Sequence, residues 1–209
     1  AYRQPWVEKM AGALQDYFLL EKSTVKAAIK SSRTRNEAEH AIQVARSACL
    51  QHLPAIFLKY YTQVADAAAQ RVQEKFQPYS KKTLRCTIFR KDAISSVTNY
   101  ASKGIQRIAD GTQSAVTTTV DDADMGDDDT DMSTLEDNID SLYDSFVETW
   151  AVAVAGDQVL VADNMGATLG AQQVEDVPVQ KVWCSVIDEK TRQTHIDADG
   201  DTVGLDEIF

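Results

Sequence analysis

Apolar residues recur every three or four positions through the first third of the chain, and this spacing is the strongest constraint on its fold. A helix turns once every 3.6 residues, so the spacing places these side chains on one helical face. The first stretch runs from Pro5 to Ile29, and proline suits the first turn of a helix. The next two stretches have apolar positions at Ala38, Ile42, Ala45, Cys49 and Leu53, and then at Phe57, Tyr61, Val64, Ala68, Val72 and Phe76. The pattern predicts three consecutive helices.

Local signals predict where these helices begin and end. Asn36 is followed three residues later by Glu39, a pattern in which each side chain can cap the start of the second helix. Pro54 is expected to end or kink that helix, because proline lacks the amide donor that a helix interior needs. The third helix is expected to stop before Pro78.

Further helices are predicted on both sides of an acidic stretch. One is expected to start at Asp92 and to close at Gly111, a residue type that commonly ends helices. Residues 120–132 contain seven aspartates and little to bury, so they predict a solvated loop. Ser133 opens a second capping pattern and a helix that is expected to break at Gly156 before another helix follows.

Charge is divided unevenly along the chain. Residues 1–107 carry 18 Lys and Arg against 8 Asp and Glu, a net charge of +10. Residues 108–180 carry 17 acidic residues and no basic ones, and residues 181–209 carry 3 basic against 7 acidic residues. A basic half could bind a polyanion that the acidic half repels. Alternatively, the opposite charges only keep a helical arm and an acidic domain soluble.

Cysteine usage and hydropathy exclude two classes of protein. Cys49, Cys86 and Cys184 are odd in number and widely spaced, which argues against a disulfide framework and for a reducing compartment. No run of 18 uninterrupted apolar residues occurs, so no membrane span is expected.

The last 29 residues contain the most specific motif. A strand-like run from Lys181 to Ile187 precedes a short helix or turn and then a turn centred on Gly200. Twelve residues of this segment form a motif with fixed spacing: Lys181, Trp183, Asp188, Thr191, Arg192, His195, Asp199, Gly200, Val203, Asp206, Glu207 and Phe209. This order resembles the signature of the phage Mu F-like head morphogenesis family, the minor head proteins of tailed bacteriophages.

The resemblance implies a structural protein rather than an enzyme. Proteins of this family associate with the portal protein and other capsid proteins, and act in head assembly, genome packaging or DNA delivery. The implied location is the virion or procapsid, with the host cytoplasm during assembly, and no cofactor is expected. A weaker likeness extends upstream to Ala162, Asn164 and Gly166, although Gly156–Gln158 replaces the family's Arg-Thr-Glu. Family members usually continue past the final Phe to a pair of cysteines, so the domain would be either truncated or diverged here.

We therefore predict a predominantly α-helical α+β fold in three parts. Residues 1–110 form a helical arm, residues 111–132 an acidic flexible linker, and residues 133–209 the Mu F-like C-terminal domain. The apolar stripes are more extensive than a small arm is expected to bury alone, so they are predicted to contact a portal or capsid partner. The candidate contacts are Phe18, Phe57 and Tyr61.

Four residues of the motif have the types that an active site would use. Asp188, Arg192 and His195 would share one face of a helix, with Asp199 nearby. One interpretation is a phage-borne hydrolase or toxin-associated enzyme that uses Asp188 and His195. The other is an Asp188–Arg192 ion pair that fixes the turn, with His195 packed or capping. The structural interpretation is preferred, because no second histidine or phosphate-binding loop completes a catalytic set.

Residues 195–200 also resemble half of a calcium-binding loop. His195 stands where the first aspartate ligand should be, and Asp206 replaces the bidentate glutamate. The pattern fails at its most demanding ligands, so no metal is expected.

A basic strip separates the third and fourth predicted helices. It contains Lys81, Lys82, Arg85, Arg90 and Lys91, interleaved with apolar residues. Such a strip could contact the backbone of double-stranded DNA without sequence preference, or it could fit an acidic protein surface.

Overall fold

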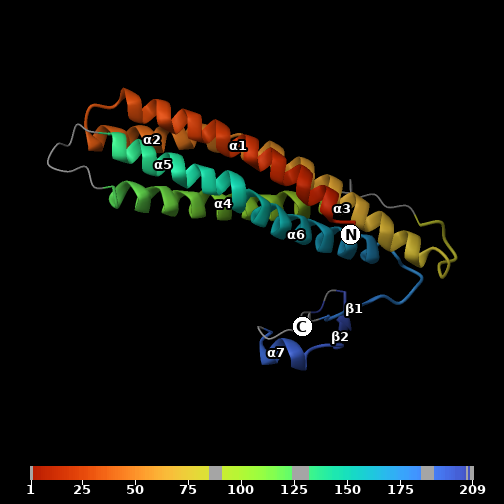
Figure 1. Ribbon diagram of the computed structural model, residues 1–209. Helices are drawn as coiled ribbons and strands as arrows, with labels where there is room; N and C mark the ends of the chain where they lie inside the picture. The colour runs from red at the N-terminus through yellow and green to blue at the C-terminus, as the bar shows by residue number, and fades with distance from the viewer. Residues whose placement is uncertain (1, 85–90, 124–131, 185–190, 206, 208–209) are drawn as a thin grey trace.

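The fold consists of long antiparallel helices followed by a small β-containing unit (Figure 1). The computed structural model describes residues 2–84, 91–123, 132–184, 191–205 and 207, with backbone alone at 91–94. The predominantly helical α+β class is confirmed. The helices are α1 (Gln4–Ser31), α2 (Arg35–Leu50), α3 (Leu53–Phe76), α4 (Lys91–Asp121), α5 (Ser133–Ser145), the π-turn η1 (Phe146–Trp150), α6 (Ala151–Gln172) and α7 (Gln193–Asp197). The strands are β1 (Gln180–Val182) and β2 (Thr202–Gly204).

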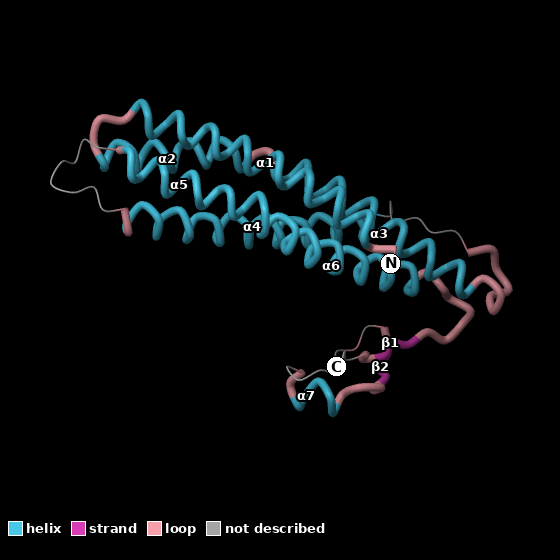
Figure 2. The backbone as a smooth tube through the Cα atoms, viewed as in Figure 1, coloured by secondary structure: helices cyan, strands magenta, loops and turns pink. Residues whose placement is uncertain are grey.

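The first six helices form one bundle with four long columns. In one column α2 is followed by α3, and in another α5, η1 and α6 run on without a break (Figures 1 and 2). A single hydrophobic core joins them, with buried residues contributed by α1 to α6. This packing differs from the predicted division at residues 110 and 133, because the helices on both sides of the acidic stretch bury their apolar faces against each other.

Two predicted helix breaks lie inside continuous helices. Gly111 is part of α4, and a Cβ atom there would lie 3.2 Å from the ring of Trp150. The glycine leaves room for this indole instead of ending the helix. Gly156 is also internal to α6. The irregular turn precedes it at η1, where the hydrogen-bonding pattern widens to that of a π-helix.

Three predicted helix boundaries are also corrected. Thr34 caps α2 by accepting a hydrogen bond from the backbone N–H of Glu37, so the cap lies two residues before Asn36. Pro54 lies in the first turn of α3, where its missing N–H costs nothing. Met132 occupies the cap position of α5 without a side-chain cap, and Glu136 instead pairs with Lys30 on α1.

Helices α3 and α6 approach each other closely. A Cβ atom on Gly166 would lie 2.2 Å from the backbone oxygen of Ala65, and one on Gly170 would lie 2.7 Å from the Cα of Ala69. The two glycines are four residues apart on α6, and the two alanines are four residues apart on α3. Each set therefore forms a stripe along one face of its helix. Because Gly166 and Gly170 have no side chain, the backbones of α3 and α6 pack directly against each other at these positions.

An alanine at position 166 should therefore destabilise the bundle. Gly166→Ala forces the methyl group into the α3 backbone, and we expect a loss of about 1–3 kcal/mol in the free energy of unfolding, as for other overpacked cores. Gly156→Ala is the matched control, because a Cβ there meets nothing within 4 Å. It should raise stability by up to about 1 kcal/mol through helix propensity. Urea titrations followed by circular dichroism measure both, and equal effects would contradict the packing argument.

The small unit after α6 is built on two paired strands. β1 and β2 are antiparallel, with Lys181 opposite Val203. α7 lies between them in sequence and is one short turn. Among the described residues, none after Val174 is buried. The unit thus has no core of its own within the described part of the chain. In the same described part, no helix combines the length and apolar character that crossing a membrane requires.

Candidate functional site

The residues of the C-terminal motif gather around the β1–β2 pair. Beyond the strands, Trp183 N–H donates to the carbonyl of Asp201 at 2.9 Å, and Gly200 N–H donates to the carbonyl of Trp183 at 2.9 Å. Gly200 has a φ of +90°, a conformation that favours glycine because other residues would clash with their own Cβ. The predicted turn at Gly200 is therefore present, and it returns the chain to Trp183.

An aromatic contact connects the strand to the short helix. The rings of Trp183 and His195 lie 5.4 Å apart in an edge-to-face arrangement. His195 is exposed and Trp183 is half-buried. Aromatic pairs in this geometry contribute about 0.5–1.5 kcal/mol.

The two ends of the motif also meet. Lys181 Nζ donates to the backbone carbonyl of Glu207, and the Glu207 carboxylate accepts from Gly204 N–H at 2.6 Å. The fold thus brings five motif residues, which span 27 residues of sequence, into one small unit.

Other motif residues play lesser parts or lie outside the description. Arg192 is exposed and occupies the cap position of α7. Thr191 is half-buried and Asp199 is exposed. Asp188, Asp206 and Phe209 lie outside the described residues, so the expected Asp188–Arg192 pair stays a prediction. No three His, Cys, Asp or Glu side chains converge as metal ligands in the described parts of the chain.

The beginning of the basic strip holds the segment that leads to this unit. Lys82 Nζ lies 2.8 Å from Glu175 in an exposed ion pair. The carboxylate of Asp176 accepts from Ser80 Oγ at 2.8 Å and from the backbone N–H of Lys81 at 2.7 Å. These hydrogen bonds lower the pKa of Asp176, and the one from Ser80 has the larger effect. Arg85, Arg90 and the side chain of Lys91 lie outside the description.

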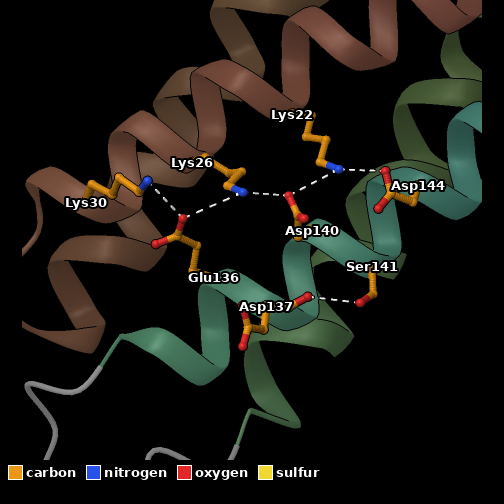
Figure 3. A network of polar contacts seen from close by, with 8 residues as sticks. All are labelled: Lys22, Lys26, Lys30, Glu136, Asp137, Asp140, Ser141 and Asp144. Atoms are coloured by element: carbon orange, nitrogen blue, oxygen red, sulfur yellow. Dashed lines mark hydrogen bonds and ion pairs between the residues drawn. The ribbon is translucent and has the colours of Figure 1, made fainter.

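Opposite charges from the two halves of the chain meet along α1 and α5. Each helix presents charged residues four positions apart, so they form an antiparallel ladder (Figure 3). Lys22 lies 2.6 Å from Asp144, and Lys26 lies 2.6 Å from Asp140. The ladder ends with Lys30 and Glu136, 3.1 Å apart. Part of the charge separation seen in the sequence is thus used inside the bundle.

The three residues proposed as partner contacts lie in the core. Phe18 and Phe57 are fully buried, and Tyr61 is 1% exposed. Phe18 packs against Phe146 and Trp150, while the Tyr61 hydroxyl donates to Gln158 Oε1 at 2.6 Å. Burial raises the pKa of Tyr61 to about 12. The apolar stripes of the predicted arm are covered by α5 and α6, which the sequence division had placed in another domain.

A buried carboxylate anchors the start of the chain to two helices. Asp163 of α6 lies 2.8 Å from Arg3 and 2.5 Å from Arg71 of α3, and it accepts from the hydroxyl of Tyr2. Burial opposes its ionisation, but the hydrogen bonds from Tyr2, Arg71 and Arg3 outweigh burial and lower its pKa. This cluster is saturated with protein donors, so it serves as a structural clamp.

A second buried polar cluster lies deeper in the bundle. Arg46 of α2 donates to Glu21 of α1 at 2.8 Å, and to Thr112 and Gln113 of α4 at 2.5 Å each. Glu21 and Thr112 are fully buried and Arg46 is 2% exposed. Burial raises the pKa of Glu21, and the adjacent Arg46 charge offsets only part of that rise. Because Glu21, Arg46 and Thr112 are enclosed by the helices that they connect, the cluster has a structural role in joining those helices.

The hydroxyls of two tyrosines adjoin the same carboxylate. Tyr17 of α1 is 3% exposed and Tyr143 of α5 is fully buried. Neither hydroxyl, nor the second oxygen of Glu21, has a hydrogen-bond partner within the described structure. Burial, followed by the nearby Glu21 charge, raises the pKa of both tyrosines. The cluster brings α5 to the same point of the core.

Removing Arg46 should destabilise the protein strongly. Arg46→Leu leaves Glu21 buried without its counter-charge, which typically costs about 3–5 kcal/mol. Its folded pKa would then rise further, so the folded state holds a proton that the unfolded state releases. The loss should therefore grow as pH increases above the unfolded value of about 4.3.

Two variants control this experiment. Glu21→Leu combined with Arg46→Leu removes both charges and should recover much of the loss. Lys26→Ala, in the partly exposed ladder, should cost at most about 1 kcal/mol. Unfolding in urea at pH 5 and pH 8 provides the comparison, and a pH-independent loss for Arg46→Leu would refute the role of Glu21.

The family of the chain is not settled by comparison with known proteins. No family model, curated protein or solved structure matches it. The spacing of the C-terminal motif and the geometry of its unit are therefore the basis for any functional assignment.

Proposed function

We propose that the chain is a minor head protein of a tailed bacteriophage that associates with the portal protein and acts in head assembly, genome packaging or DNA delivery. The observation that carries this proposal is the C-terminal motif, with twelve positions at the spacing of the Mu F-like signature. On this proposal the chain is a structural component, and neither a cofactor nor a metal takes part in its function.

The geometry supports the proposal in two ways. Residues Lys181, Trp183, His195, Gly200 and Glu207 hold the C-terminal unit together, as expected of a motif that specifies structure instead of catalysis. The described part of the unit also has no buried residue, so its surface is available for contact with another capsid component. A long bundle with a small projecting unit suits a protein that contacts other capsid components.

The proposal is tested by locating the protein in phage particles. Mass spectrometry of purified virions and procapsids from a phage that encodes this chain should detect it at a fixed ratio to the portal protein. Deleting its gene should give particles that lack it and that package DNA poorly or infect inefficiently. Absence of the protein from both particle types would refute the assignment.

A substitution at His195 separates this proposal from the hydrolase alternative. His195→Gln removes the imidazole but keeps a polar side chain, so particle incorporation should stay within about twofold of wild type. The local cost should be at most about 1–2 kcal/mol, because His195 is exposed and contributes one ring contact. Trp183→Ala, which removes the larger partner, should reduce incorporation more. Loss of a measurable hydrolytic activity in a folded His195→Gln protein would favour the enzyme.

Contact with double-stranded DNA through the basic strip is a second part of the proposal. The test uses the full chain, because its helices share one core. If Lys81, Arg85, Arg90 and Lys91 bind phosphates, changing all four to Ala should reduce the salt dependence of binding. The expected reduction is about 0.9 log units for each phosphate that the variant no longer neutralises.

Lys82→Ala provides the control for this experiment. Lys82 already pairs with Glu175, so its removal should change the salt slope little. DNA binding that is absent at low salt would rule out the DNA contact and leave the strip to an acidic protein surface.

A further inference from the structure

A groove lies between α4 and α6 at the end of the bundle nearest the C-terminal unit. Its volume is about 390 Å³, and Val161, Met165 and Leu169 of α6 supply apolar lining. Tyr100 of α4 also lines it and is 43% exposed. Gln172, the last residue of α6, also lines it. The groove thus ends where the chain leaves the bundle.

Positively charged residues follow Tyr100 along α4, beside the groove. Lys103 Nζ lies 5.5 Å from the centre of the Tyr100 ring. Arg107 follows one helical turn further along α4, on the same side as Lys103 and Tyr100. Within the described residues, neither Lys103 nor Arg107 forms an ion pair, whereas the lysines of α1 facing α5 all do. An occupant with apolar and acidic side chains would fit the groove and these cations.

The C-terminal unit has the complementary properties. Val182 is 52% exposed, Trp183 is only half-buried, and none of the described residues of the unit is fully buried. Residues 181–209 carry 7 acidic against 3 basic residues. A two-stranded hairpin is at best marginally stable in water, so a surface that covers it would stabilise it.

We propose that the C-terminal unit closes onto the α4–α6 groove as a lid, with the Val182–Trp183 edge covering the apolar lining and the net negative charge of the unit brought close to Lys103 and Arg107. The structure shows the open arrangement, in which the unit lies apart from the bundle (Figure 2). This inference does not rest on the proposed function, since it uses only the groove, the tether and their charges.

The connecting segment permits this closure. Its anchored end is Asp176, held by Ser80 and Lys81, and Cys184 follows eight residues later. Eight extended residues span at most about 26–29 Å. Thr168 of the groove lies one turn, or about 6 Å, before the end of α6. A short tether also gives the unit an effective concentration in the millimolar range, so a weak contact is sufficient.

An engineered disulfide tests the closure directly. Cys184 is exposed in the unit and Cys49 is buried in the bundle. In a Cys86→Ser background, Thr168→Cys places a thiol in the groove. A disulfide requires Cα atoms within about 7 Å, so mild oxidation should join residues 168 and 184 only if the lid closes. Peptide mapping by mass spectrometry identifies the bond within one chain.

Charge and position controls accompany the disulfide. Val44→Cys on α2 is 57% exposed and outside the groove, so it should yield at least tenfold less bond to Cys184. Adding Lys103→Glu and Arg107→Glu to the Thr168→Cys protein should slow bond formation several-fold, whereas Lys59→Glu on α3 should not. Equal yields for Thr168→Cys and Val44→Cys would overturn the proposal. Bonds found only between two chains would overturn it as well, because the groove would then accept the unit of a second copy.

Discussion

The guanidinium group of Arg46 determines how α1, α2 and α4 fit together where they meet. It is enclosed by α1, α2 and α4, and its planar array of donors is divided between Glu21, Thr112 and Gln113. A buried pair of this kind adds little net stability, because removing two charges from water costs about as much as their attraction returns. Its effect is on alignment. If one helix slid by a turn, a charge would be left buried without a partner, which is more costly than removing an apolar side chain from its neighbours.

Apolar packing at the other end of the bundle works by shape instead of charge. Gly166 and Gly170 bring the backbone of α6 against Ala65 and Ala69 of α3, and no larger residue fits there. Close packing leaves α3 and α6 in extensive contact, whereas α4 stands further from α6 and leaves the groove lined by Tyr100. The polar cluster and the glycine stripe therefore fix different parts of the bundle by different means.

Periodicity predicts the helices well because the spacing of apolar residues is a property of the local sequence. It could not assign what covered each stripe. A separate domain at 133–209 would leave Phe18 and Phe57 for a partner to cover. Instead, Phe18 packs against Phe146 and Trp150 of η1, and Phe57 lies against Gly104 of α4 in the same chain. Gly111 was interpreted as a stop signal, although its neighbour Trp150 is 39 residues away and invisible to local rules. In the C-terminal unit, the turn at Gly200 was foreseen, but the contacts of Lys181 and Trp183 with distant residues depend on strand register.

The ion pairs of the bundle explain part of the charge asymmetry of the sequence. Acidic residues of α5 neutralise the lysines of α1, and Asp163 neutralises Arg3 and Arg71, so much of the apparent polyanion-binding capacity is used internally. Glu175 and Asp176 likewise engage the start of the basic strip. Some cations of the described bundle have no acidic partner, such as Lys103 and Arg107. These residues therefore predict the position of an acidic partner surface better than the net charge of the segment does. Because exposed ion pairs are weak and screened by salt, contacts at such a surface are reversible under physiological conditions. A lid held in this way could open whenever a stronger acidic competitor reaches the groove.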